Sequence, residues 1–317
     1  MSIGAHLNHP VTVLTSRPVP EPHPFTSLVE LPRDDYAVAR AHNPTANGAL
    51  HWAPHLDTGY GDRMGAIVQW VRDAQPEVFV VDVSVEVAVF VRLLGVPVVV
   101  TALPGNRIDA PHRLVHRMAD QIIAAWPKDL RVPSWLRPHE NKTAFVGGIS
   151  RFDGRPRCED EHAGTRVVVL SGADGMCVRE SEADADAGRD SVTWMSLGAK
   201  PGDWTADPWP QLSAADVVVT HAGQNCIADV AAASRPTIVI PQTRPFDEQR
   251  TTAEVLHRHH LAVVASRWPQ RHAWPALLDR ARSMDTERWK LWETEGAAGR
   301  AAKAIEDTAL RCRGRSV

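Results

Sequence analysis

The sequence predicts an α/β protein in which parallel β-sheets are covered by helices. Short runs of β-branched residues recur along all 317 residues, and each is followed by a segment of helical character. These runs are apolar without strict alternation, which is typical of strands buried on both faces of a parallel sheet. Alternation of strand and helix over the whole chain favours units with right-handed crossovers.

In the first half, the apolar segment 85–94 predicts a buried helix, and the segment 63–74 predicts a helix with Ile67, Trp70 and Val71 on one side. The expected strands around these helices are 11–15, 78–81, 96–101, 121–125 and 143–146.

In the second half, the segment 298–310 predicts an amphipathic helix with Ala301, Ile305 and Ala309 on one face. Two further helices are expected over 226–233 and 249–259. The expected strands are 167–170, 192–195, 217–220, 237–240 and 262–264.

Between the halves, the segment 147–164 is rich in glycine and poor in apolar residues, which predicts a linker. We therefore expect an N-terminal domain over 1–148, a linker over 149–164 and a C-terminal domain over 165–317. The acidic tract 179–190 predicts a solvated loop or a frayed helix.

Composition narrows the class of protein. The chain is 44% hydrophobic and 23% charged with a formal net charge of −3, so it can form packed cores and has no basic field for nucleic acid. Four cysteines without paired spacing argue against a disulfide scaffold or a cysteine-based zinc site. Charges interrupt the apolar stretch 78–103, which excludes a membrane span there, and the N-terminus lacks a signal-peptide pattern. We expect a cytoplasmic protein.

Cofactor motifs are absent from the sequence. No G-x-G-x-x-G follows a strand and no G-x-x-x-x-G-K-[ST] occurs, which disfavours a dinucleotide cofactor and a P-loop. Neither H-E-x-x-H nor G-x-S-x-G is present. We expect neither a bound cofactor nor a metal.

The segment 215–249 carries most of the chemical information, with the pattern strand, glycine turn, helix, strand, loop, helix. Gly223 lets the backbone approach a ligand, and the amides that open the next helix bind phosphate at its positive dipole end. His221 and Asn225 add side-chain donors beside this turn. The alternative for His221 is an ordinary loop histidine after a buried strand.

Further polar residues follow this turn. Asp229 lies one helical turn after Asn225, where its carboxylate can accept hydrogen bonds from a ribose diol. Glu248 and Gln249 begin the next helix and offer an acceptor and an amide to sugar hydroxyls. Phosphate, ribose and sugar contacts in a row indicate a nucleotide sugar. Alternatively, Asp229 is a solvated helix residue and the Glu248–Gln249 pair stabilises the helix dipole.

Residues 220–229, Thr-His-Ala-Gly-Gln-Asn-Cys-Ile-Ala-Asp, resemble the His-Cys-Gly-Trp-Asn-Ser-x-x-Glu signature of UDP-glycosyltransferases. The whole segment 215–249 resembles glycosyltransferase family 28 more closely. This resemblance implies the GT-B fold, in which two dinucleotide-type domains face each other across a cleft. The acceptor binds the N-terminal domain and the UDP-sugar, a co-substrate, binds the C-terminal one.

The resemblance also implies roles for individual residues. Asp229 would contact the ribose, and Glu248 with Gln249 the transferred sugar. A glycine-rich loop near the phosphates would contain Ser171, Gly172 and Gly175, and Trp204 or the backbone after it would hold the uracil. The residues expected at the diphosphate are His221, Gly223, Gln224 and Asn225.

Three departures separate this sequence from the family pattern. Cys226 stands where a hydroxyl is usual, and Asp229 replaces a glutamate and is shorter by one methylene. The chain begins with what resembles the end of the first helix, so we expect the first strand, its glycine-rich loop and most of that helix to be missing. This predicts either a misassigned start or a defective relative.

The first half offers one group for catalysis. Asp82, Ser84 and Glu86 follow the expected strand 78–81 and open an apolar helix, at the end of a strand that faces the cleft. Asp82 or Glu86 could act as the general base, or the group could simply cap the helix. His112 and His116 share a helix face at ligand spacing, but without a third partner a solvated face is expected.

The sequence thus predicts a glycosyltransferase that moves a hexosyl group from a UDP-sugar to an acceptor hydroxyl, metal-independent and, by analogy with the family, inverting. A nucleotide-sugar 2-epimerase and a defective nucleotide-sugar-binding relative are the alternatives. The acceptor stays open between a lipid-linked sugar, a small molecule and a polymer. Peripheral membrane contact is compatible with the sequence, and no nucleic-acid partner is expected.

Overall fold

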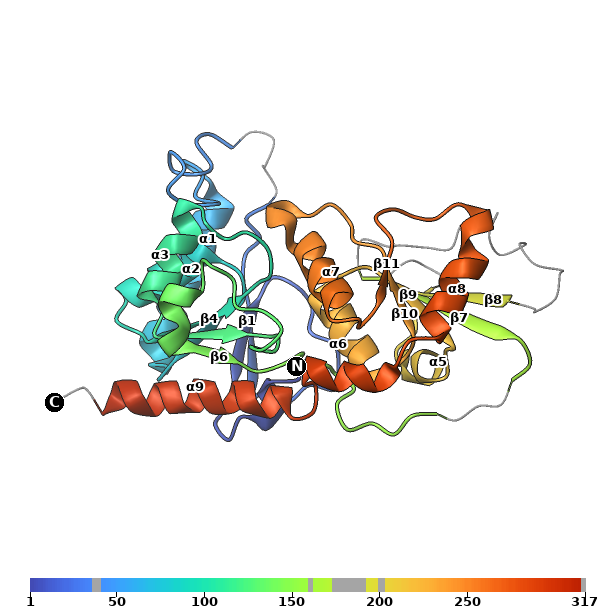
Figure 1. Ribbon diagram of the computed structural model, residues 1–317. Coiled ribbons are helices and arrows are strands. Elements are labelled where there is room, and N and C mark those ends of the chain that lie inside the picture. Colours follow the sequence, from blue (N-terminus) through green and yellow to red (C-terminus); the bar gives the residue numbers. More distant parts are fainter. Residues whose placement is uncertain (36–40, 159–161, 173–191, 199–202, 315–317) are drawn as a thin grey trace.

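A computed structural model describes residues 1–35, 41–158, 162–172, 192–198 and 203–314 of the chain. Two α/β units lie side by side, and the last helix runs back from the second unit beneath the first (Figure 1). Among the described residues, none of the helices has the length and apolar character needed to cross a membrane.

The N-terminal unit contains two parallel sheets rather than one. Strands β1 (Thr12–Thr15) and β2 (Ser27–Glu30) form a two-stranded sheet. Strands β3 (Phe79–Val81), β4 (Val98–Ala102), β5 (Gln121–Ala124) and β6 (Thr143–Phe145) form the second, in the order β3-β4-β5-β6. The sequence did not predict β2, whose side chains are mostly exposed. Its four residues carry only a weak hydrophobic pattern.

The described α-helices within the N-terminal stretch of the chain are α1 (Thr58–Ala74), α2 (Val85–Leu93) and α3 (Ala110–Met118). Helix α1 begins five residues earlier than predicted, because Asp57 caps it by accepting a 2.7 Å hydrogen bond from the Tyr60 amide. One core holds the unit together: Leu14 of β1 packs on the same buried cluster as Ile67 and Val81. The two sheets therefore share a hydrophobic core.

The described strands of the C-terminal unit form a continuous five-stranded parallel sheet in the order β11-β10-β9-β7-β8. Val168 and Val218 face one buried cluster and Val167 and Val217 the other, so these strands are apolar on both sides, as predicted. The strands are β7 (Thr165–Leu170), β8 (Val192–Leu197), β9 (Val217–Thr220), β10 (Thr237–Val239) and β11 (Val263–Val264). The α-helices are α5 (Trp209–Ser213), α6 (Gln224–Ala233), α7 (Glu248–Arg258) and α8 (Trp274–Arg282).

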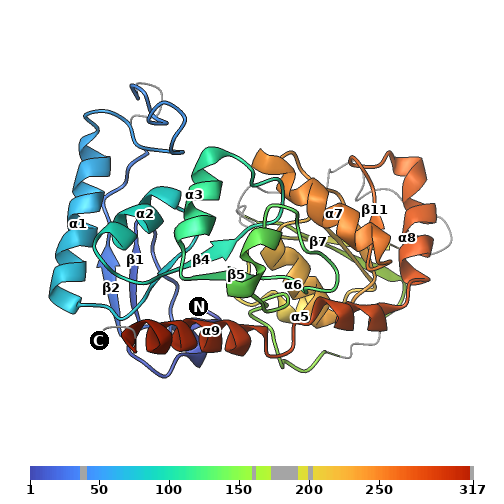
Figure 2. The ribbon, with the colours of Figure 1, turned by 60° about the vertical axis from the view of Figure 1, so that its left-hand side comes forward.

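Helix α9 (Ala297–Arg313) joins the two units. Its predicted apolar face is buried: Ala301 and Ile305 pack against Val99 and Ile123 of the N-terminal sheet (Figure 2). Its C-terminal part therefore belongs by packing to the N-terminal unit. The remaining short elements are 3-10 helices: η1 (Gly4–His6), η3 (Arg137–Lys142), η4 (Pro245–Asp247), η5 (Arg271–Ala273) and η6 (Thr286–Trp292).

The predicted linker is only partly a free segment. Gly147 adopts a φ of 79°, and a Cβ there would lie 2.1 Å from the Glu293 carbonyl oxygen, so only glycine fits. Ser150 and Phe152 are buried. The first part of the linker is therefore packed against the C-terminal unit, which brings residues 150 and 151 to the site described next.

Candidate functional site

A cleft of about 690 Å³ lies between the two units. Its N-terminal wall includes the carboxyl ends of β3 and β4, and its C-terminal wall includes the end of β7 and the start of α6. Ligands bind at such strand ends in open α/β sheets. The residues proposed from the sequence that line it are Asp82, Ser171, Gly172, Trp204, Gln224, Asn225 and Asp229. Gly175 lies outside the described residues.

Helix α6 opens into this cleft without a side-chain cap from any described residue. The Nε2 atom of Gln224 is buried and has no hydrogen-bond partner there. A Cβ at position 223 would lie 2.7 Å from Cε1 of His221, so a larger residue there would force the imidazole to shift. Open amides at a helix start, next to an unsatisfied amide side chain, suit an anionic ligand.

His221 is buried and supports the turn. Its Nδ1 lies 3.0 Å from the Gly223 amide nitrogen, and its Nε2 lies 3.1 Å from the Gly172 amide nitrogen. A neutral imidazole accepts at one ring nitrogen only, so only one of these two amides donates a hydrogen bond to the ring in a given tautomer, and the ring packs between both loops. His221 is not among the described residues of the cleft wall. The expected contact of His221 with a diphosphate stays a prediction.

Asp229 lies at the base of the cleft and is 5% exposed. Its Oδ1 accepts a 2.8 Å hydrogen bond from Ser150 Oγ, and its Oδ2 accepts one of 3.2 Å from Arg151 Nε. Burial raises the pKa of the Asp229 carboxyl, although Arg151 opposes the rise. The solvated-helix alternative for Asp229 is wrong. Nearby, burial raises the pKa of the Cys226 thiol to about 11, so this thiol is neutral.

Glu248 and Gln249 do not line the described cleft wall. Glu248 Oε2 accepts a 3.0 Å hydrogen bond from Nη2 of Arg107 in the N-terminal unit, and Gln249 Oε1 accepts one of 2.9 Å from the Gln242 amide. Burial raises the pKa of Glu248, against the attraction of Arg107. Glu248 thus forms an ion pair between the units, and its contact with a sugar stays a prediction.

Asp82 faces the cleft from the opposite wall, where it accepts a 2.7 Å hydrogen bond from Thr101 Oγ1. The next residue, Val83, has a φ of 77°, an unfavourable conformation for a β-branched side chain. Ser84 caps α2 by accepting a hydrogen bond from the Val87 amide, as the capping interpretation predicted. This strained turn presents the Asp82 carboxylate at the end of β3.

Glu86 is buried and has other partners. Its Oε1 accepts hydrogen bonds from the backbone amides of His51 (2.7 Å) and Trp52 (3.0 Å), and Oε2 accepts one from Ser84 Oγ. These contacts hold the segment before α1 in place. They favour Asp82 over Glu86 as the group available to an acceptor, and the catalytic role of Glu86 stays a prediction.

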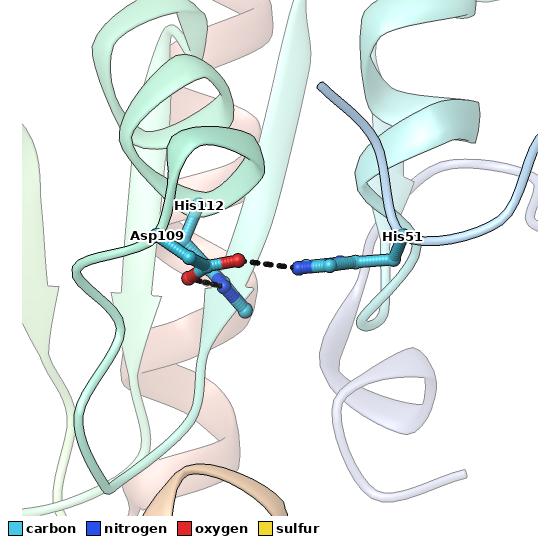
Figure 3. Close-up of side chains that lie close together, drawn as sticks. All are labelled: His51, Asp109 and His112. Carbon is cyan, nitrogen blue, oxygen red and sulfur yellow. Dashed lines mark hydrogen bonds and ion pairs between the residues drawn. The ribbon is translucent and has the colours of Figure 1, made fainter. Parts of the chain in front are cut away.

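The structure also reveals a cluster that sequence analysis missed (Figure 3). Asp109 Oδ2 lies 2.6 Å from His51 Nε2, and Asp109 Oδ1 lies 2.5 Å from His112 Nδ1. Burial lowers the pKa of His112, and the hydrogen bonds from the two imidazoles keep the pKa of Asp109 low despite its burial. The pairing of Asp109 with His112 at i, i+3 was visible in the sequence, whereas no local pattern pointed to His51.

The expectation of a solvated face for His112 and His116 is wrong. Both are buried, and the His116 ring stacks on Trp135 with centroids 4.8 Å apart. Burial lowers the pKa of His116 to about 3. Helix α3 packs on α2, and Phe246 of the C-terminal unit lies over the His112 ring, so both neighbours remove this face from water.

Part of the chain is similar in sequence to known glycosyltransferases. Residues 204–271 match the glycosyltransferase family 28 C-terminal domain. A curated relative from Sorangium cellulosum, UDP-N-acetylglucosamine–N-acetylmuramyl-(pentapeptide) pyrophosphoryl-undecaprenol N-acetylglucosamine transferase, is 29% identical over 204 residues, which are 56% of this chain and 49% of the relative. The chain thus spans about half the length of the curated relative it matches.

Solved structures show the same architecture. Os79 from O. sativa, in complex with UDP, has a TM-score of 0.61 at 14% identity, covering 95% of this chain and 94% of its own. The calicheamicin glycosyltransferase CalG4 has a TM-score of 0.58 at 16% identity, over 92% and 87%. MurG of Acinetobacter baumannii has 0.52 at 14% identity, over 89% and 85%. The chain thus has the GT-B fold of these glycosyltransferases, and residues 204–271 are similar to the family 28 C-terminal domain.

Proposed function

We propose that this protein transfers a hexosyl group from a UDP-sugar to an acceptor hydroxyl, with inversion and without a metal ion at the diphosphate. The observation that carries the proposal is the uncapped start of α6, which opens into the cleft opposite Asp82. The curated relative is named as a transferase of N-acetylglucosamine, and Os79 was solved with UDP bound. Both names fit a nucleotide-sugar donor.

Release of the diphosphate from the donor depends on stabilising its negative charge. A departing diphosphate gains negative charge, which the amides at the start of α6 stabilise together with the Gln224 and Asn225 side chains. Asp229 accepts hydrogen bonds from the ribose hydroxyls, and the exposed ring of Trp204 stacks on the uracil.

The acceptor half uses Asp82. This carboxylate takes the proton of the acceptor hydroxyl, the hydroxyl oxygen bonds to the anomeric carbon, and the carbon–phosphate oxygen bond breaks with its electron pair leaving on UDP. Inversion is proposed by analogy with the family, and the placement of Asp82 and the α6 start on opposite walls of the cleft supports it. We place the reaction in the cytoplasm, in keeping with the free cysteines Cys158, Cys226 and Cys312.

Calorimetry with UDP tests the donor site. Asn225→Ala should weaken UDP binding by about tenfold, the equivalent of one charge-assisted hydrogen bond. Asn141→Ala, an exposed asparagine of the N-terminal unit, is the matched control and should bind UDP normally. The wild type should bind 2'-deoxy-UDP more weakly than UDP, whereas Asp229→Ala should bind the two alike. Unchanged UDP affinity in Asn225→Ala would contradict the proposed diphosphate site.

Turnover tests Asp82 separately. UDP release from UDP-hexoses, measured over a panel of hydroxyl acceptors, should fall by about 10²–10⁴-fold in Asp82→Asn. The UDP affinity of this variant should stay that of the wild type. If Asp82→Asn turns over at the wild-type rate, Asp82 is not the base. If the wild type binds UDP but turns over no donor, the protein is a nucleotide-sugar-binding relative.

A further inference from the structure

We propose that His51, Asp109 and His112 bind one divalent transition-metal ion at a site separate from the donor cleft. One ligand atom from each residue lies within 4.8 Å of the other two. Figure 3 shows the side chains pointing toward one another, His51 from the segment before α1 and the other two from the start of α3. None of the three is among the residues that line the 690 Å³ cleft.

The donor set suits zinc, cobalt or nickel. Imidazole nitrogens and a carboxylate oxygen are ligands that these ions accept, at about 2.0–2.2 Å from the ion. Two ligand atoms of one tetrahedral ion are therefore about 3–4 Å apart. Small side-chain rotations bring these atoms into this geometry, and the ion replaces the N–H protons that His51 and His112 direct at Asp109, so binding should release protons.

Asp109 is oriented for this role rather than for capping. It occupies the N-cap position of α3, where a carboxylate normally accepts a hydrogen bond from a backbone amide of the first turn. Here the side chain makes no capping hydrogen bond, and both oxygens point at imidazoles instead. The helix start thus gives up a cap that contributes about 1 kcal/mol in other helices.

The other two ligands are held by separate contacts. Glu86 accepts hydrogen bonds from the amides of His51 and Trp52, which fixes the backbone that carries the first imidazole. The His112 ring lies edge-on to Phe246, with centroids 4.9 Å apart. Buried partners of this kind orient metal ligands and strengthen binding.

Charge and exposure around the site are compatible with a cation. The positive group that contacts the cluster is Arg107, with Nη1 3.4 Å from His112 Nε2, and its charge is balanced by Glu248 at 3.0 Å. The side chains of His51 and Asp109 are 33% and 31% exposed, against 10% for His112. Water can therefore reach the fourth coordination position from the solvent side.

Titration calorimetry and visible absorption with Co²⁺, and calorimetry with Zn²⁺, test the site on the full chain. We expect one ion per chain, with a d–d absorption band for bound cobalt. His51→Ala, Asp109→Asn and His112→Ala should each weaken binding by at least about tenfold. The matched control is His55→Ala, an exposed histidine of the same segment whose Nδ1 contacts His42 at 3.2 Å, and it should bind as the wild type does.

Several results would overturn the proposal: no binding to the wild type, binding that all three variants retain, or binding that only His55→Ala removes. His51 is partly exposed, so His51→Ala keeps the test valid if the buried His112→Ala fails to fold. UDP affinity should stay unchanged in His51→Ala, which separates this proposal from that of the donor cleft. Added Zn²⁺ should also raise the melting temperature of the wild type and not that of His51→Ala.

Discussion

The two units differ in how their strands are paired into sheets. In the C-terminal unit, the described strands form one continuous sheet, and both of its faces are buried. In the N-terminal unit, the β1-β2 pair is separate from the sheet that begins at β3. A shared helical layer rather than a hydrogen-bonded ladder therefore joins the N-terminal sheets.

This difference places the rigid part of the site on the C-terminal side. The turn between β9 and α6 rises from a sheet that is fully paired at its centre, with β9 hydrogen-bonded to both β7 and β10. The opposing wall depends on β3, an edge strand of its sheet whose Val80 is 37% exposed. The C-terminal wall of the cleft is therefore held more firmly than the N-terminal wall.

The largest contrast should appear in core substitutions. Ile238, at the centre of β10, is 0% exposed, whereas Leu28 of β2 is 44% exposed. Ile238→Ala should lower the free energy of unfolding by about 2–5 kcal/mol, because it leaves a cavity. Leu28→Ala should change it by no more than about 0.5 kcal/mol. Urea denaturation measures both, and equal losses would show that the β1-β2 sheet is as firmly packed as the C-terminal sheet.

Alanine substitutions at two glycines should change the stability of the protein in opposite directions. Gly223→Ala places a Cβ 2.7 Å from the His221 ring and should destabilise the protein by about 1–3 kcal/mol. Gly65, in the middle of α1, has nothing within 4 Å of an added Cβ. Gly65→Ala should therefore stabilise the protein by about 0.5–1 kcal/mol. Thermal melts followed by circular dichroism measure both changes. A neutral Gly223→Ala would mean that the imidazole can move aside.

The fold was predictable because its signals are local. Buried parallel strands are continuous apolar runs, so β4, β7 and β9 were found within one or two residues of their bounds. The exposed strand β2 escaped because its few residues do not contrast with the loops around them. The amphipathic face of α9 was also predicted, but not that it packs under the N-terminal sheet, since periodicity does not name a partner.

The candidate site was predictable only where its residues are neighbours in sequence. The motif around Gly223 located the start of α6, yet could not show that the His221 ring turns into the protein to hold Gly172. Glu248 is paired with Arg107 from 141 positions away, and His51 meets Asp109 across 58 positions. Such pairings come from the way the units pack, which no local pattern records.

The smallest expected effect is on the pH dependence of stability, and it concerns the buried carboxylate of Asp229. Burial raises the pKa of Asp229 above the value of 3.8 that an unfolded chain would show. The folded state therefore binds the carboxyl proton of Asp229 more tightly than the unfolded chain does. The resulting stabilisation is complete below pH 3.8 and is lost as the pH rises through the folded-state pKa. The Asp229→Asn side chain does not titrate, so it lacks this contribution to stability. The stability of the wild type relative to Asp229→Asn should fall with rising pH, by at most about 1.4 kcal/mol per pH unit, and then level off.

Urea denaturation of both proteins between acid and neutral pH measures this difference directly. A constant difference, or one that grows with pH, would mean that Arg151 and Ser150 stabilise the anion more than burial penalises it. In that case Asp229 would already be a paired anion before any ligand arrives, and the ribose hydroxyls would have to displace Arg151. If the difference falls with pH, burial penalises the Asp229 anion more than its partners stabilise it. Hydrogen bonds from a ribose would then stabilise the charged carboxylate, so UDP binding should lower its pKa.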